Sequence, residues 1–491
     1  MRVMTRVMAA VVAFALLFTF IPGKSTAATP YQGYIWNSKG RDIASINGYK
    51  YKQSIDGYGM PSGAFNAPED VFIADDRSVY IVDTGNSRIV QLDSSLQYVR
   101  TIGDSEGDGV LSEPKGVYVT PDGTIYVADT KNARIVLFDK NGKYMKQFGK
   151  PDSPLIGDTF SYSPSKLLVD KRGYMFVVSD GNTQGLLQID KNGAFKGFYG
   201  ANHIGFSWGR LLRNMFATDA QKSQMATVKP LEFSNAVLDN EGFIFTTTLG
   251  TETNQIKRLS PVGVDTIGGN RQFGDLWSNG PFMVASFIDV AVDSNGIFTG
   301  LDLQTGKVFQ YDKLGNMLFA FGGIGEQNGL FVTPSALAQS SDGTIFVADK
   351  GRNRIDLFRT TPFALLVQKA SAFYVDGRYD EAESLWNEVL RENANYELAY
   401  LAIGKSLYKA ERYKEAMSYF KLANSRGDYS AAFKEYRKEY MRDHFLSICL
   451  ILVGAIILLR YLIPWAWRLA ARRIRMKRSN YGAQQGGGIP Q

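Results

Sequence analysis

Residues with reactive side chains are scarce in this 491-residue chain, which holds two histidines and one cysteine. Cys449 lies inside an apolar segment, His444 comes directly before that segment, and His203 is the remaining imidazole. The sequence therefore offers neither a Ser-His-Asp nor a Cys-His arrangement for nucleophilic catalysis. It also lacks the histidines of a catalytic zinc site and the glycine-rich loop that cradles a nucleotide phosphate. We expect no catalytic residues and no cofactor.

Side chains that carry oxygen give a second chemical possibility. Carboxylate and amide groups recur near the starts of several apolar runs. Calcium and magnesium prefer oxygen ligands of this kind. Whether these groups can meet in space depends on the elements that carry them. The candidates are Glu69, Asp70, Glu232, Asn235 and Asp289.

A pattern of short apolar runs recurs between residues 57 and 359, and its clearest copy spans residues 114–149. Apolar residues alternate with period two in each run, and Asp122-Gly123 and Asn141-Gly142 separate neighbouring runs. Such dipeptides predict tight turns, because glycine tolerates a positive φ. One copy thus predicts four short antiparallel strands. The other copies begin near Pro68, Pro164, Phe233, Phe287 and Pro334.

The second predicted strand of several copies ends in a shared motif. Residues 126–129, Tyr-Val-Ala-Asp, are followed by Asn-Ala-Arg-Ile at 132–135, and residues 80–89 and 346–355 repeat this order. These segments resemble NHL repeats, most clearly in the first, second and sixth copies. The resemblance implies an all-β, six-bladed β-propeller, which we place at residues 31–361. A repeat of four strands at this period is typical of that fold.

The sixth copy stops at Phe358 and lacks a fourth strand. Residues 34–46 resemble the hairpin of a third and fourth strand. We predict that this N-terminal segment completes the last blade and closes the ring, because an unpaired edge would expose backbone donors and acceptors.

A longer insertion separates the third and fourth copies, at residues 201–229. Trp208, Leu211 and Met215 follow a helical spacing, and Arg210 and Arg213 fall on another face. One interpretation is a helix packed on the rim of the propeller. The other is a lid over a binding face, with Trp208, Arg210 and Arg213 as binding residues.

The predicted propeller also resembles gluconolactonase-like propellers, which bind a divalent ion through Glu, Asn and Asp in the central channel. This resemblance implies calcium or another divalent metal as a cofactor in an alternative reading. Its candidate ligands are Glu69, Asp70, Asn235 and Asp289. They lie near the starts of first strands, where channel-facing residues are expected.

The apolar period becomes helical after residue 361. Tyr379 and Ala382 recur 34 residues later as Tyr413 and Ala416. These segments resemble tetratricopeptide (TPR) repeats and imply a small α-helical TPR-like domain over residues 363–444. Two repeats are fewer than the three that usually form a stable array. The domain is therefore either a peptide-binding groove or a stalk that spaces the propeller from a membrane.

Two apolar segments predict the topology. Residues 1–27 show the basic, apolar and small-residue order of a secretory signal peptide, with an uncleaved anchor as the alternative. Residues 445–467 match the length of a transmembrane helix. Residues 468–491 hold six basic residues and no acidic one. This excess predicts a cytoplasmic tail and an extracytoplasmic N-terminal bulk in a cell membrane.

The net charge of +7 arises from the two terminal segments, so no basic face for nucleic acid is predicted. The leading hypothesis is a membrane-anchored, non-enzymatic scaffold that binds a protein, peptide or glycan outside the membrane. A further hypothesis is an accessory subunit of a transporter or envelope complex that docks through the TPR-like segment. The alternative is a metal-dependent, gluconolactonase-like hydrolase.

Overall fold

The computed structural model describes residues 29–104, 107–157, 160–202, 230–275 and 284–484, with side chains up to residue 476. The predicted signal peptide and the binding candidates Trp208, Arg210 and Arg213 lie outside the described residues, as does His203. The chain divides into two compact units, Met1–Ala399 and Tyr400–Gln491. Each unit is treated by itself.

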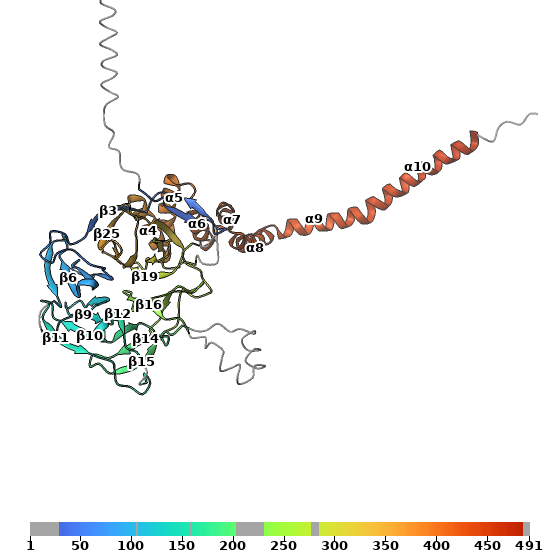
Figure 1. Cartoon of the computed structure of the whole chain (residues 1–491). Coiled ribbons are helices and arrows are strands. Elements are labelled where there is room, and N and C mark those ends of the chain that lie inside the picture. Colours follow the sequence, from blue (N-terminus) through green and yellow to red (C-terminus); the bar gives the residue numbers. More distant parts are fainter. Residues whose placement is uncertain (1–28, 105–106, 158–159, 203–229, 276–283, 485–491) are drawn as a thin grey trace, which may run out of the picture. The chain divides into compact units, whose positions relative to one another are not determined.

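The first unit is built around six antiparallel sheets that form the blades of a β-propeller (Figure 1). The first strands of the six blades contact one another in cyclic order, and the last returns to the first. In chain order the blades are β4 (Asp70–Ile73), β5 (Val79–Asp83), β6 (Arg88–Leu92) and β7 (Tyr98–Ile102); β8 (Gly116–Val119), β9 (Ile125–Asp129), β10 (Arg134–Phe138) and β11 (Tyr144–Phe148); β12 (Pro164–Val169), β13 (Met175–Ser179), β14 (Leu186–Ile189) and β15 (Phe195–Tyr199); β16 (Phe233–Leu238), β17 (Ile244–Thr248) and β18 (Ile256–Leu259); β19 (Phe287–Val292), β20 (Phe298–Asp302), β21 (Lys307–Tyr311) and β22 (Met317–Gly322); β23 (Pro334–Gln339), β24 (Ile345–Asp349) and β25 (Arg354–Thr360).

The turns within the blades follow from a repeated Asp and Gly pair. Asp139 Oδ1 accepts hydrogen bonds from the backbone N–H groups of Asn141 (2.9 Å) and Lys143 (2.8 Å). Gly142 adopts a φ of +80°, which a residue with a Cβ rarely does. The side chain of the aspartate thus fixes the turn that the glycine permits. Asp93, Asp190, Asp293 and Asp312 accept the same two bonds in other hairpins.

The ring closes through a strand that the sequence reading did not assign. β3 (Tyr49–Ile55) pairs antiparallel with β25 as the fourth strand of the sixth blade. The predicted closing segment is wrong: β1 (Tyr34–Trp36) and β2 (Asp42–Ala44) instead extend the fifth blade beyond β22. The fourth strand of a blade is half exposed, so the polar sequence of β3 carries only a weak strand signal.

Two helices belong to the propeller unit, α4 (Pro362–Val375) and α5 (Tyr379–Glu392). Thr361 caps α4 by accepting a hydrogen bond from the backbone of Ala364 at 3.2 Å. The Phe363 ring packs edge-on against Phe319 of β22, with centroids 6.1 Å apart. These helices therefore pack on the outer part of the fifth blade.

The second unit is helical, with one apolar helix at its end. Phe445–Met476 is long and apolar enough to cross a membrane, with a mean hydropathy of 2.6 over its most apolar 18 residues. A π-helical turn precedes Pro464, whose ring cannot fit the regular hydrogen-bond ladder. The elements are α6 (Glu397–Lys409), which begins in the first unit, α7 (Tyr413–Leu422), α8 (Arg426–Asp443), α9 (Phe445–Ile457), η3 (Leu458–Leu462) and α10 (Ile463–Gln484).

Candidate functional site: the channel centre and the inter-blade loops

The six first strands place one residue each at an equivalent position. Each of these residues stands two positions after a Pro or Phe at or just before the start of the strand, and each pairs with the penultimate residue of the second strand. Because the first strands contact one another in a ring, the six positions surround the propeller axis. We call them the channel belt: Asp70, Gly116, Lys166, Asn235, Asp289 and Ala336.

Asp70 is tied to the second blade and, across it, to the third. Its Oδ1 atom lies 2.6 Å from the Nζ of Lys166, and its Oδ2 atom accepts the backbone N–H of Val117 at 3.1 Å. A Cβ on Gly116 would lie 2.4 Å from the carbonyl oxygen of Ser165, so this belt position requires glycine. Burial raises the pKa of Asp70, and the Lys166 ammonium acts against that rise.

Asp289 holds the other side of the belt. Its Oδ2 atom accepts the backbone N–H of Leu337 at 2.8 Å, and its Oδ1 atom accepts bonds from Val290 N–H and from the Asn235 side chain. Burial raises the pKa of Asp289 to about 7. The positive charge of Lys166 opposes this rise, and the negative charge of Asp70 adds to it.

The predicted oxygen-bearing residues therefore divide into two groups. Asp70, Asn235 and Asp289 converge in the belt, whereas Glu69 and Glu232 do not join them. Glu69 Oε1 pairs with Lys350 at 3.1 Å, and Glu232 accepts a hydrogen bond from the backbone of Gly181. Within the described residues, no group of three or more His, Cys, Asp or Glu side chains is arranged to hold a metal ion.

Lys166 is the belt residue that sequence reasoning missed. Its side chain is 12% exposed, and its Nζ also donates to the backbone carbonyl of Glu69 at 3.2 Å. The sequence did contain a signal for this residue, because Lys166 follows Pro164 at the same spacing at which Asp70 follows Pro68.

The NHL-type motif has a structural role beneath the loops that join successive blades. Asp129 is fully buried and accepts bonds from Arg134 Nε at 2.7 Å, Asn132 Nδ2 at 2.9 Å and the backbone N–H of Ser112 at 2.7 Å. Arg134 also donates to the carbonyl of Val110 at 2.6 Å. The motif thus clamps the loop before the second blade onto the end of β9.

The clamp recurs in the first and sixth blades. Asp83 accepts Arg88 Nε at 2.7 Å and the backbone N–H of Asn66 at 2.6 Å. In the sixth blade Asp349 accepts the backbone N–H of Val332 at 2.9 Å. The cation that pairs with Asp349 is Arg352 rather than Arg354, which occupies the arginine position of the motif. Three inter-blade loops are therefore held by buried ion pairs.

The inter-blade loops, both the three clamped ones and those before β12 and β16, expose apolar side chains. Strands within a blade run antiparallel, so the inter-blade loops lie at one end of the strands and the turns from the third to the fourth strand lie at the other. We call the first the inter-blade face. Tyr58 and Leu155 are its most exposed apolar members, at 86% and 71%. Among the residues that the structure describes, the set is Tyr58, Val110, Leu155, Leu231, Ile324 and Val332.

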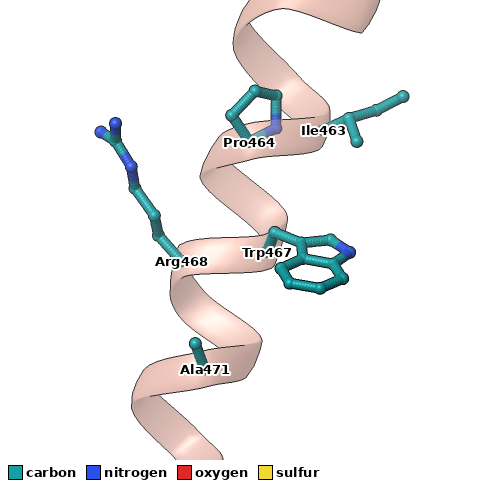
Figure 2. A pocket seen from close by; sticks show the side chains of 5 residues that line it. All are labelled: Ile463, Pro464, Trp467, Arg468 and Ala471. Carbon is teal, nitrogen blue, oxygen red and sulfur yellow. The ribbon is translucent and has the colours of Figure 1, made fainter.

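The second unit carries a shallow recess on α10, at the basic end of the apolar helix. Figure 2 shows Trp467 and Arg468 leaving this helix on different sides below Pro464. The lining is formed by Ile463, Pro464, Trp467, Arg468 and Ala471. The other two sequence candidates also lie in this unit: His444 stacks on Tyr440 with centroids 4.2 Å apart, and Cys449 lies within α9.

Comparison with known proteins supports the repeat. The NHL repeat family matches residues 111–138, and no curated protein matches the chain. A streptogramin B lyase structure is similar at 11% identity and a TM-score of 0.40, over 67% of this chain and 86% of that one. A virginiamycin B lyase from Staphylococcus aureus has 12% identity and a TM-score of 0.40, over 64% and 100%. Kuenenia stuttgartiensis hydrazine synthase has 11% identity and a TM-score of 0.39, over 64% and 99%.

Proposed function

We propose that this chain is a membrane-anchored, non-enzymatic scaffold that binds a protein or peptide partner through the inter-blade face of its propeller. The observation that carries the proposal is the repeated Asp and Arg clamp beneath loops that expose apolar side chains. A buried ion pair is expensive to form, and here it orders loop backbone on either side of a buried apolar anchor, which is Phe65, Leu111 or Phe331.

Ordering the loops in advance favours binding. A partner that docks on a fixed loop does not have to restrict that loop's conformations, so less of the contact energy is lost. Most members of the inter-blade face are aliphatic, with Tyr58 as the aromatic member. Apolar side chains of this kind suit the core of a protein–protein contact better than the polar surface of a glycan.

Anchoring rests on the apolar helix that spans Phe445–Met476. Arg468, Arg472, Arg473 and Arg475 follow the most apolar part of the helix, which favours a cytoplasmic tail and an extracytoplasmic propeller. A secretory signal at residues 1–27 would deliver the propeller to that side. We further propose that α6, α7 and α8 connect the anchor to a transporter or envelope complex.

Site-specific photo-crosslinking in the native membrane tests the binding face. A photoreactive residue replaces Tyr58 or Leu155 on the inter-blade face, and Val262 serves as the control. Val262 is 82% exposed but lies in a hairpin turn at the opposite end of the strands. We expect the same protein adduct from Tyr58 and Leu155 and none from Val262. Adducts of equal yield from all three positions, or from none, would contradict the proposal.

The enzymatic alternative makes a separate prediction. A gluconolactonase-like hydrolase would turn over a lactone, and a chelator would abolish this activity. We expect no turnover by the purified full-length chain. Chelator-sensitive turnover that survives Tyr58→Ala but not Asp289→Asn would replace the scaffold with an enzyme.

A further inference from the structure

We propose that Lys166 is the resident cation of the propeller channel and takes the place that a divalent ion would otherwise occupy. The belt is then a latent metal site, closed by an ammonium group of the chain itself. This inference goes beyond the proposed function and does not depend on partner binding.

The first step is the placement of charge around the ring. Three alternate blades carry the charged belt residues Asp70, Lys166 and Asp289. The other three blades carry Gly116, Asn235 and Ala336, which are small or uncharged. The only cationic side chain in the belt thus belongs to a blade that lies between the two carboxylate-bearing blades.

The second step is the cost of burying two carboxylates together. Asp70 and Asp289 are buried, at 8% and 2% exposure, and each receives backbone N–H groups. Backbone donors solvate a carboxylate but carry no net charge. Two like charges in a poorly hydrated site repel each other unless a cation or a proton is present. Lys166 supplies the positive charge 2.6 Å from Asp70.

The third step is competition for the same oxygen atoms. A calcium ion binds carboxylate and amide oxygens at about 2.3–2.6 Å. Asp70 Oδ1 already contacts the ammonium, and Asn235 Nδ2 donates to Asp289. A divalent ion beside the ammonium would experience repulsion at short range in a medium of low polarity. The donor set with Lys166 in place therefore does not fit a divalent ion.

Removing the ammonium would change this balance. Without Lys166 the belt keeps two carboxylates and one amide, which are the oxygen ligands that calcium prefers. The side-chain oxygen of Asn235 accepts only the N–H of its own neighbour Ala236, at 2.7 Å. Rotation of this amide would direct its oxygen toward a bound ion. The Lys166→Met variant is therefore expected to gain a calcium site.

The experiment measures thermal unfolding of the full-length chain in detergent, with EDTA or with calcium chloride. The wild-type midpoint should be the same in both. Lys166→Met should unfold several degrees lower in EDTA and recover part of this loss in calcium. Lys166→Arg, which keeps the charge, should remain insensitive to calcium. The double variant Lys166→Met with Asp289→Asn should lose the calcium response.

Two outcomes would overturn the inference. The first is a wild-type chain that holds one divalent ion per molecule by elemental analysis and unfolds lower in EDTA. The second is a Lys166→Met variant that does not respond to calcium, whether or not its stability falls. If this variant does not fold in EDTA, its refolding is compared with and without calcium. Failure to refold in either condition would also overturn the inference. None of these measurements uses a binding partner, so their failure is distinct from failure of the scaffold proposal.

Discussion

At the scale of single residues, buried ion pairs do the structural work of the repeat. Asp129 is fully buried and is neutralised by Arg134, whose guanidinium also holds two backbone carbonyls of the loop before β8. Exposed ion pairs contribute little to stability, whereas loss of one partner from a buried pair leaves an uncompensated charge. The clamps therefore differ in kind from the many ion pairs on the surface of the chain.

The clamp predicts a large effect from one substitution. Arg134→Ala leaves the Asp129 carboxylate buried without its cation, so the free energy of unfolding should fall by about 3–5 kcal/mol. Chemical denaturation measures this loss, and limited proteolysis should show new cleavage between β7 and β8. The matched control is Lys131→Ala, which breaks an exposed pair with Glu113. The control substitution should lower the free energy of unfolding by less than about 1 kcal/mol. Equal losses in both variants would contradict the clamp.

Asp289 predicts a dependence of stability on pH. Its pKa rises from 3.8 to about 7 in the folded chain. Between these two pH values the folded state therefore holds a proton that the unfolded state has released. Unfolding in that window releases the proton, and the free energy of unfolding therefore falls as pH rises from about 4 to about 7. The charged groups that face Asp289 are Lys166 and Asp70. Asp289→Asn should flatten this slope in denaturation curves recorded across the window. An unchanged slope would show that another group is responsible.

At the scale of elements, ring closure depends on β3 rather than on the two strands that precede it. Tyr49 at the start of β3 is fully buried, and its ring stacks on Phe321 with centroids 4.8 Å apart. Its hydroxyl oxygen accepts hydrogen bonds from Gln310 at 2.7 Å and Gln368 at 2.9 Å. One side chain of β3 thus connects the fifth blade, the sixth blade and α4.

Tyr49→Ala should consequently be far more destabilising than a similar change in β1. Removing a buried aromatic side chain costs about 3–5 kcal/mol, and two hydrogen-bond donors lose their acceptor. Trp36→Ala is the matched control, because Trp36 is half-buried in β1, which lies outside β22 in the sheet of the fifth blade. Urea denaturation of the two variants compares the losses. A greater loss in Trp36→Ala would contradict this role of Tyr49 in ring closure.

At the scale of the whole molecule, the boundary between compact units does not follow the boundary between strands and helices. The first unit extends to Ala399 and includes α4 and α5. Tyr396, which follows α5, is fully buried and donates its hydroxyl to the carbonyl of Leu318 in β22 at 2.8 Å. Trp386 of α5 stacks on Tyr396 at 6.2 Å. The first helix pair is therefore part of the propeller's packing and has less free surface for a peptide groove.

Two truncations test this boundary. A chain that ends at residue 399 should unfold in one cooperative transition, because it keeps the contacts of α4, α5 and Tyr396. A chain that ends at residue 361 exposes Phe319 and leaves Tyr49 without its bond from Gln368, so it should unfold at lower temperature and aggregate. Thermal unfolding monitored by circular dichroism distinguishes them. Equal midpoints would mean that the helices contribute nothing to the propeller.

Much of the fold was predictable because its signals are local. Hairpin turns depend on Asp and Gly pairs a few residues apart, and strands depend on alternation with period two. The six copies, the first strand of each and the apolar helix after Phe445 could therefore be predicted along the chain. Asp70, Asn235 and Asp289 could be selected as channel residues because each stands near the start of a first strand.

The sequence by itself determined the repeat and the order of its elements, since these depend on neighbouring residues. Only the tertiary structure decided which distant groups meet. Lys166 reaches Asp70 across an intervening blade, β3 pairs with a strand some 300 residues later, and Tyr396 packs against β22. Such contacts depend on how the ring closes, and closure is set by the combined packing of all blades rather than by any local pattern.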